Sequence, residues 1–557
     1  MRTRNEMWSA LGTREVDLLV VGGGIVGAGI ARDAARRGLD VAVVEMQDLA
    51  WGTSSRSSKL VHGGVRYLEQ YEFGLVFESV SERRILMDLA PHLVNPLGFL
   101  FPVYKGAKHK LWVINAGMWL YDGLSLFRSP RVHKNLSPRE VEALEPAVRQ
   151  EGLKGAPLYW DCSTDDARLT IETAIDAAAH GATIATWSKV ESFVLDDGKV
   201  RGALVRDAFS GETKTVRARL VVNATGPWTD RTLALANAAR PAPLLRPTKG
   251  VHIVVDAAKL PVSNAVVCTH PIDKRVLFVI PWGDRAYVGT TDTDFEGDPG
   301  DVHATRRDVD YLLAATREHF PDFPLTHADI IATWAGIRPL IAPPPVDAGQ
   351  TASEVSREHE ILMGPNGVLT VGGGKLTTYR RMAAEAVDNA VRWLELSGGI
   401  SKPLESADTA KHPLPGAEGW PEDDDHAAVG HRVLDASKGT LSEASAQYLA
   451  NTYGMRALVL ADRVRREPKL GAPLVPGRPE ILGQVDWAVT EELAASVSDV
   501  MTRRTQLFYR DHDQGLGAAE AVGQRMQALL GWTPERFQEE VDRYRQDVAL
   551  SRQWRDE

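Results

Sequence analysis

Cysteine is scarce in this chain: only Cys162 and Cys268 occur in 557 residues. Two cysteines exclude a disulfide framework, and they exclude an iron–sulfur cluster held by the four cysteines that such clusters usually need. Long apolar runs are also missing: no stretch of about 18 apolar residues occurs, so we expect no transmembrane helix. The N-terminal residues lack the apolar core of a secretory signal. The sequence therefore predicts a cytoplasmic protein in a reducing compartment.

An excess of basic residues is absent as well. The chain has 64 Lys and Arg residues against 74 Asp and Glu residues, which gives a net charge of −10. We therefore expect no nucleic-acid partner, since surfaces that bind nucleic acids are usually basic. Apolar residues make up 44% and charged residues 25% of the chain, which is typical of a globular protein. The length predicts about two to four domains.

An apolar strand runs into a glycine-rich turn near the N-terminus. Gly22, Gly24 and Gly27 have the spacing of a dinucleotide-binding fingerprint. Gly22 allows a tight turn, Gly24 lets a pyrophosphate approach the backbone, and Gly27 lets the following helix pack closely. The N-terminus of that helix would direct unpaired N–H groups at the phosphates. Glu45 ends a second strand, where its carboxylate can accept hydrogen bonds from a ribose. This order predicts a Rossmann-like α/β domain that binds a dinucleotide.

Two more apolar strands that end in glycine lie far along the chain, at 220–226 and 368–374. Short apolar runs bounded by glycine are typical of buried parallel strands. We therefore expect the dinucleotide domain to be assembled from distant pieces. Apolar runs between them, at 251–255, 276–280 and 285–289, predict a separate antiparallel sheet.

These patterns divide the chain into four parts. We expect a discontinuous dinucleotide-binding domain of residues 14–75, 160–230 and 360–398, and a substrate-binding lobe of residues 76–159 and 231–359. A linker rich in Gly, Pro and Asp follows at 399–426, and residues 427–557 are expected to form a C-terminal helical domain. Two helix starts are predicted there: a capping box at 440–443, and Thr533 followed by Pro534 at the first helical position.

Two segments favour FAD over NAD as the dinucleotide. The loop at 52–69 is rich in Ser and Gly and follows the second strand closely, so it can wrap a long flavin chain. The glycines at 372–374 precede another helix, whose positive end could face a flavin pyrimidine ring. A nicotinamide enzyme would more often continue with a plain βαβ unit.

The chain resembles the FAD-dependent glycerol-3-phosphate dehydrogenases. The blocks that carry the resemblance are, in order, 22–27, 53–69, 223–228, 249–252, 279–282, 289–292, 336–339 and 373–380. The resemblance implies a FAD-binding domain like those of glutathione reductase and D-amino-acid oxidase, an α+β substrate lobe and a C-terminal all-α cap domain. It also implies oxidation of sn-glycerol 3-phosphate to dihydroxyacetone phosphate, with hydride transfer from C2 to N5 of FAD and electrons passed to a membrane quinone.

The resemblance further implies a set of binding residues. The cofactor-binding residues would be Gly22, Gly24, Gly27, Glu45, Thr53, Ser54, Ser58, Lys59, Gly226, Gly374, Leu376 and Thr377. The substrate-binding residues would be Arg66, Tyr67, Arg338, Arg357, Lys375 and Thr378. Arg338 is the first choice for the phosphate, because a guanidinium makes paired, charge-assisted hydrogen bonds to phosphate. No metal site is expected.

Three side chains are candidates for the base that takes the proton of the C2 hydroxyl. His62 lies among glycines in the loop expected to cross the flavin, and His252 opens a strand. Histidine titrates near neutral pH and suits the task. Lys375 follows the glycine turn, where desolvation would lower its pKa enough for it to act as base. The sequence does not choose among them, and Asp292 is expected either to be structural or to orient a histidine.

Three alternatives stay open. The same reaction could be completed by oxygen, as in a glycerol-3-phosphate oxidase, although no long insertion of the oxidase kind is seen. An amine could be the substrate, or the chain could be a FAD-binding regulatory protein without turnover. The expected partners are glycerol 3-phosphate, a quinone and the lipid surface on the inner face of the cell membrane. The basic and aromatic segment 105–121 is either the membrane contact or a buried helix between lobes; a homodimer is a further option.

Overall fold

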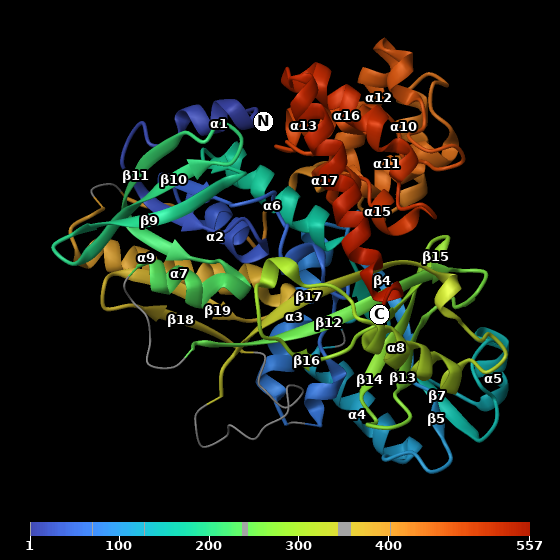
Figure 1. Cartoon of the computed structure of the whole chain (residues 1–557). Helices are drawn as coiled ribbons and strands as arrows, with labels where there is room; N and C mark the ends of the chain where they lie inside the picture. The colour runs from blue at the N-terminus through green and yellow to red at the C-terminus, as the bar shows by residue number, and fades with distance from the viewer. Residues whose placement is uncertain (1, 70, 127, 237–242, 344–357, 401–402) are drawn as a thin grey trace.

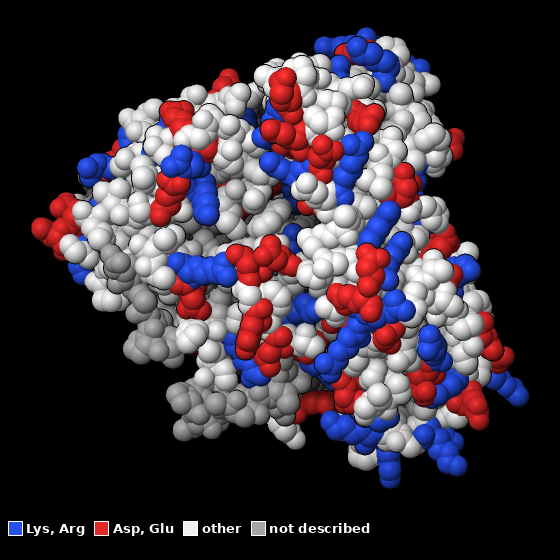
Figure 2. Space-filling model, in the orientation of Figure 1, with Lys and Arg blue, Asp and Glu red and all other residues white. Residues whose placement is uncertain are grey.

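Two β-sheets and a C-terminal group of helices make up the protein (Figure 1). The computed structural model describes residues 2–69, 71–126, 128–236, 243–343, 358–400 and 403–557, and the side chain of Arg66 lies outside this description. Within the described residues, no helix is long and apolar enough to cross a bilayer. On the face drawn in Figure 2, acidic and basic side chains are interspersed.

The first sheet has the strand order β18-β19-β11-β1-β2-β8, and its central strands are parallel. Its strands are β1 (Val16–Val21), β2 (Val41–Val44), β8 (Thr183–Ala185), β11 (Thr213–Asn223), β18 (His359–Met363) and β19 (Val368–Gly373). The strands β9 (Ser188–Asp196) and β10 (Lys199–Asp207) continue antiparallel from β11. The glycine-bounded runs predicted from the sequence thus join the sheet of β1: β11 pairs with β1 and β19 pairs with β11, although two hundred residues or more separate them from β1 along the chain.

The strand β1 is apolar except for Asp17, because its other residues are buried on both faces. Leu18 and Val20 pack against the helices α2 (Ile25–Arg36), α6 (Asp166–Ala179) and α9 (Tyr379–Leu396). Leu19 and Val21 belong to a second core on the other face, which includes residues of β9, β10 and α1 (Arg4–Ala10). The result is a three-layered domain with the carboxyl ends of the parallel strands at one edge.

The second sheet has the order β16-β12-β15-β14-β13-β4-β7-β3, and β17 also pairs with β12. Its strands are β3 (Leu60–Val61), β4 (Asn95–Leu100), β5 (Val103–Tyr104), β6 (Lys134–Leu136), β7 (Leu153–Ser163), β12 (Leu245–Asp256), β13 (Ala265–Thr269), β14 (Val276–Trp282), β15 (Arg285–Gly289), β16 (Thr293–Asp294) and β17 (Ile330–Ile341). The three runs predicted to form a separate sheet are in β12, β14 and β15, which pair antiparallel as expected. The helix α8 (Arg306–His319) covers one face of this sheet.

Helices near the sheets include α3 (Phe73–Leu89), α4 (Leu111–Leu124), α5 (Pro138–Leu144) and α7 (Thr229–Leu235). The C-terminal helices are α10 (His426–Ala436), α11 (Glu443–Tyr453), α12 (Ala457–Arg466), α13 (Gly483–Glu491), α14 (Val497–Asp499), α15 (Leu507–Arg510), α16 (Leu516–Leu530) and α17 (Pro534–Arg552), and a π-helical turn spans Val500–Arg504. Thr533 caps α17 with Pro534 first in the helix, as predicted. The predicted capping box at 440–443 is wrong, because Ser442 caps α11 by accepting from the N–H of Ser445 at 3.0 Å.

The C-terminal helices pack directly on the second sheet. One apolar core contains Tyr287 and Trp334 of the sheet together with Val500 and Tyr509 of the helical region. In Figure 1, α17 descends from the other C-terminal helices to the sheet, so that the C-terminus ends beside α8. The segment predicted as a linker also packs on the first domain: Leu414 is buried, and the N–H of Gly416 donates to Glu172 of α6 at 2.8 Å. The helical region is therefore part of the same body as the sheets.

Candidate active site

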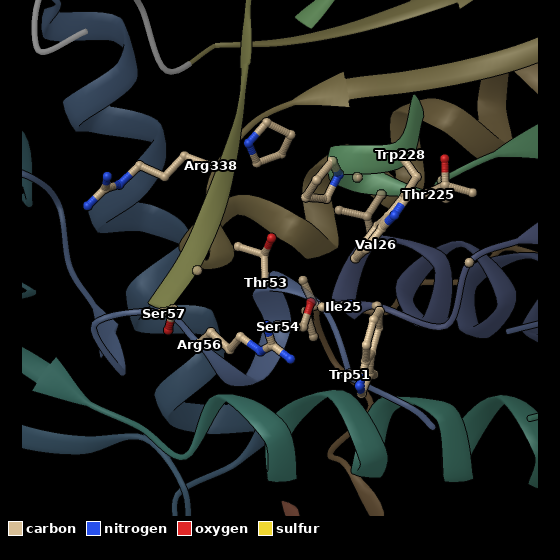
Figure 3. Close-up of a pocket in the computed structure, with 18 of the residues that line it drawn as sticks. Ile25, Val26, Trp51, Thr53, Ser54, Arg56, Ser57, Thr225, Trp228 and Arg338 are labelled. Atoms are coloured by element: carbon tan, nitrogen blue, oxygen red, sulfur yellow. Dashed lines mark hydrogen bonds between the residues drawn. The ribbon is translucent and has the colours of Figure 1, made fainter. Parts of the chain in front are cut away.

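A cavity of about 1000 Å³ joins the two sheets. Its lining comes from the carboxyl ends of β1, β2, β11 and β19 and, on the other side, from β12 and β17. Crevices at the carboxyl ends of parallel strands are the usual ligand sites of such sheets. Figure 3 shows residues of both origins facing this space.

The glycine turn after β1 fits a dinucleotide. Gly22 has a φ of 111°, and a Cβ there would lie 2.5 Å from the carbonyl oxygen of Ala224. A Cβ on Gly27 would overlap the carbonyl oxygen of Gly22. Gly24 caps α2 and lines the cavity, so the N–H groups of the first helical turn are open to a diphosphate. This cradle excludes larger residues for steric reasons, and it accommodates the phosphates of FAD.

Glu45 stands at the end of β2 and lines the cavity. One carboxylate oxygen accepts from the N–H of Gly23 at 2.6 Å and the other from that of Gln47 at 2.9 Å. Burial raises the pKa of Glu45, although these two hydrogen bonds oppose the shift. Glu45 therefore holds the glycine turn in place, and its remaining lone pairs are available to a ribose.

The hydroxyl-rich loop after β2 is tied to both sheets. Thr53 donates to the carbonyl oxygen of Ile337 at 2.6 Å, and Ser54 Oγ accepts from the N–H of Ile25 at 2.9 Å. Ser58 Oγ lies 2.9 Å from Nε2 of His252. These three hydroxyls line the cavity, whereas Lys59 is buried behind it with Nζ 2.6 Å from Asp166. Lys59 holds the loop, because its charge is already paired.

Arg338 reaches the cavity from β17. The neighbouring strand β12 has Gly250 at this point, and a Cβ there would lie 2.7 Å from Cζ of Arg338, so the glycine makes room for the guanidinium. Asp292 accepts from Nη1 at 3.0 Å, and Thr290 accepts from Nη2 at 3.0 Å. Arg275 donates to the same carboxylate at 2.5 Å. Two guanidinium groups share this carboxylate at the cavity.

The three candidate bases all line this cavity. The loop of His62 is fixed to the turn after β19, because Thr377 Oγ1 accepts from its N–H at 3.1 Å and donates to its carbonyl oxygen at 3.2 Å. Lys375 lies with Nζ 3.9 Å from the centre of the Tyr67 ring and 3.3 Å from Ser79 Oγ. The structure thus brings together residues that are more than 300 positions apart in the sequence.

His252 has a different environment from His62. Its ring is buried and stacks on Trp334 with 4.6 Å between centres, while His62 is only half-buried. Burial lowers the pKa of His252 well below its usual range, and the positive charges of Arg338 and Lys59 lower it further. His252 is therefore neutral near pH 7, and protonating it there is unfavourable.

The remaining predicted residues fall into three groups. Gly226, Gly374, Leu376, Thr377 and Tyr67 line the cavity. Thr378 is buried behind the turn, where its hydroxyl points back to the carbonyl oxygen of Lys375 at 3.5 Å. Arg357 and the side chain of Arg66 lie outside the described residues.

Sequence reasoning missed part of the lining. Trp51 and Trp228 stack with 5.5 Å between ring centres at the cavity edge, and Arg56 faces the same space. Arg56 lies within the hydroxyl-rich loop that the sequence analysis described, and it is the only cation among residues 52–58. A single cation among small polar residues could have identified Arg56 as a candidate. Nothing in the sequence indicated that the two tryptophans pair, because they come from distant segments.

The comparisons with known proteins agree with this geometry. A family model described as FAD dependent oxidoreductase matches residues 17–380. The glycerol-3-phosphate dehydrogenase from Bacillus halodurans, solved with FAD, matches with a TM-score of 0.80 at 31% identity over 98% of this chain and 97% of that one. The aerobic glycerol-3-phosphate dehydrogenase of Staphylococcus epidermidis is 39% identical over 545 residues, which is 97% of this chain and 96% of the relative.

The chain belongs to the FAD-dependent glycerol-3-phosphate dehydrogenase family. Another relative of the same name, from Staphylococcus aureus, is 39% identical over 95% of this chain and 94% of the relative. A model described as the C-terminal domain of alpha-glycerophosphate oxidase matches residues 407–537. Glycine oxidase from Geobacillus kaustophilus shares the fold alone, with a TM-score of 0.53 at 20% identity over 72% of this chain. The expected fold class, family and FAD cofactor are confirmed.

Proposed function

We propose that this enzyme oxidises sn-glycerol 3-phosphate at C2 to dihydroxyacetone phosphate and passes the electrons to a membrane quinone. The names of the full-length relatives support the substrate. The single structural observation that carries the proposal is that Arg338 and Lys375 line the FAD cavity together. FAD, when bound, supplies the acceptor for the hydrogen that leaves C2.

In this proposal Arg338 holds the substrate phosphate. Asp292 and Thr290 fix its guanidinium, so its paired N–H groups are oriented before the phosphate arrives. Lys375 adds a second positive charge. Because Ser79 and the Tyr67 ring hold it at a defined place, it can attract the substrate's oxygen atoms without a large rearrangement.

We assign the base to His62. Protonating His252 is opposed by burial and by two nearby cations, whereas His62 is only half-buried and lines the same cavity. His252 instead positions Ser58 through the 2.9 Å contact at Nε2. We expect His62→Gln to reduce kcat at least about 100-fold and His252→Gln to reduce it much less. If His252→Gln gives the larger loss of kcat and His62→Gln stays near wild type, the assignment is wrong.

Anaerobic reduction of the bound flavin tests the substrate. Glycerol 3-phosphate should bleach the flavin absorbance, whereas glycerol and amino acids at the same concentration should leave it oxidised. Bleaching by an amino acid or secondary amine instead would favour the amine-oxidising alternative. A flavin that none of these compounds bleaches would favour the regulatory alternative without turnover.

The electron acceptor has a second candidate, oxygen. The observation that favours it is the match of residues 407–537 to a domain model named for alpha-glycerophosphate oxidase. Peroxide released in a 1:1 ratio to product under air would support the oxidase. Slow reoxidation by air together with rapid reoxidation by a soluble quinone analogue would support the dehydrogenase.

An exposed apolar surface supports the membrane part of the proposal. We name it the α3–α4 face: it consists of Tyr71, Phe73, Phe77, Trp112, Val113, Trp119 and Leu120. Trp112 is 68% and Trp119 56% exposed, so α4 is not the buried helix between lobes that was the alternative. Exposed Lys105, Lys108 and Lys110 precede the helix, which suits an anionic lipid surface. In Figure 1, α4 lies at the opposite end of the molecule from α10 and α12.

Vesicle co-sedimentation tests the α3–α4 face. Burying a large aromatic side chain contributes on the order of 2 kcal/mol, so Trp112→Ala with Trp119→Ala should weaken binding to anionic vesicles at least about tenfold. The matched control is Ile272→Ala with Leu396→Ala, which removes two exposed apolar residues, 84% and 85% exposed, outside this face. Equal recovery of both double variants in the pellet would refute the assignment.

A further inference from the structure

Arg56 is a cation at the cofactor cavity to which neither the sequence nor the proposed reaction assigns a role. It follows the turn Thr53–Ser55 and lines the cavity. In Figure 3 its side chain points toward Ser54 and Trp51, and the side chain of Arg338 extends to a different part of the site. Its Cζ lies 5.4 Å from the centre of the Trp51 ring. The guanidinium thus has a defined place, supported by an aromatic face.

No described residue accepts a hydrogen bond from the guanidinium of Arg56 or forms an ion pair with it. The negative charge of Asp547 raises the pKa of Arg56, but less than burial lowers it, and Asp547 accepts a hydrogen bond from Ser498 at 2.6 Å. Asp48, in the same loop region, is taken by Arg503 and Arg504. Burial lowers the pKa of Arg56, and the positive charge of Arg503 lowers it further. A partly buried cation without an ion-pair partner favours binding of an anionic group.

Two anions are expected in this cavity, the diphosphate of FAD and the phosphate of the substrate. Ser54, two residues before Arg56, holds the N–H of Ile25 in the first turn of α2, where the diphosphate is expected. The backbone of Arg56 packs against Gly336 of β17, where a Cβ would lie 2.7 Å from the carbonyl oxygen of Arg56. This packing fixes the loop on the substrate side, while the side chain turns toward α2. The placement favours the diphosphate.

We propose that Arg56 is a cofactor-binding residue that pairs with the diphosphate of FAD and closes the phosphate site opposite the N-terminus of α2. The planar guanidinium can donate two parallel hydrogen bonds to phosphate oxygens, which a lysine cannot do. The inference depends on the FAD cofactor of the family and is independent of which substrate is oxidised. In this proposal Arg56 destabilises the apoprotein and stabilises the holoenzyme.

The proposal predicts opposite effects of Arg56 on the stability of the apoprotein and of the holoenzyme, which a merely structural residue would not show. Arg56→Gln and Arg56→Lys are compared with the wild type after FAD is removed. We expect Arg56→Gln to raise the Kd of FAD at least tenfold and Arg56→Lys to raise it less. We also expect the melting temperature of the apoprotein to stay equal or increase, while that of the holoenzyme at fixed FAD falls. The matched control, Arg246→Gln, removes an arginine paired with Asp294 and should change neither quantity by a comparable amount.

Competition with FAD by ADP or adenosine tests whether Arg56 binds the diphosphate of the cofactor or the phosphate of the substrate. ADP carries the diphosphate and adenosine lacks it, so Arg56→Gln should weaken ADP competition against FAD and leave adenosine competition unchanged. A Kd of FAD within twofold of wild type, with a lower apoprotein melting temperature, would show a structural residue and overturn the proposal. An unchanged Kd of FAD with a raised KM for glycerol 3-phosphate would place Arg56 at the substrate phosphate, which also overturns it.

Discussion

Replacing Arg338 with alanine tests how the cationic pocket works. The guanidinium lines the cavity and is held there by Asp292 and Thr290. Two charge-assisted hydrogen bonds to phosphate at such a site are worth about 3–4 kcal/mol after allowance for partial exposure. This corresponds to a fall in kcat/KM of roughly 100- to 1000-fold, since each 1.4 kcal/mol is a factor of about ten. Asp292 keeps Arg275 as a partner after the substitution.

The assay is anaerobic dye reduction with glycerol 3-phosphate and, separately, with glycerol. Arg338→Ala should raise the KM for the phosphate ester strongly, leave flavin bound, and leave glycerol as unreactive as it is with the wild type. Arg338→Lys should recover only part of the loss, because a lysine cannot make the paired contact. Arg246→Ala, on the adjacent strand, is the control. Lost flavin with an unchanged KM for glycerol 3-phosphate would refute the reasoning.

Three more outcomes are expected. Lys375→Ala should depress kcat at least about 100-fold with flavin retained, and near-normal turnover would remove Lys375 from the site. Burial lowers the pKa of His92 from 6.5 to about 3. Below pH 6.5 the unfolded chain gains a proton that the folded protein does not, so stability falls by about 1.4 kcal/mol per pH unit as the pH drops toward 3. His92→Gln should reduce this loss, and a melting temperature with the wild-type pH dependence would contradict it. Asp48 accepts from Arg503 at 2.6 Å and from Arg504 at 2.7 and 2.9 Å inside the protein, so Asp48→Asn should lower the free energy of unfolding by about 3–5 kcal/mol. Asp486 pairs with partly exposed Arg525, so Asp486→Asn should have a much smaller effect on the free energy of unfolding. Equal losses for Asp48→Asn and Asp486→Asn would argue against a special role of the buried pairs of Asp48 with Arg503 and Arg504.

The features that the sequence predicted are local ones. Gly22, Gly24 and Gly27 have roles that depend on their spacing and on the strand before them, so the turn can be read from a few residues. The apolar runs of β1, β11 and β19 likewise mark buried strands without any partner being known. Thr440 shows the limit of such patterns. Residues 440–443 match the capping-box sequence pattern, but Ser442 caps the helix, because local signals place helix ends only to within a residue or two.

The chain alone thus determined the dinucleotide fold, the cofactor class and the set of cations and histidines, because these depend on residue types at short spacing. Only the tertiary structure decided how they combine. Packing placed Lys59 behind the cavity, separated buried His252 from half-buried His62, and joined Arg338 to Arg275 through Asp292. It also brought Arg503 and Arg504 to Asp48 and placed Arg56 in the lining of the cavity. Charge pairing and burial act between side chains that meet in space, and sequence spacing carries no measure of that distance.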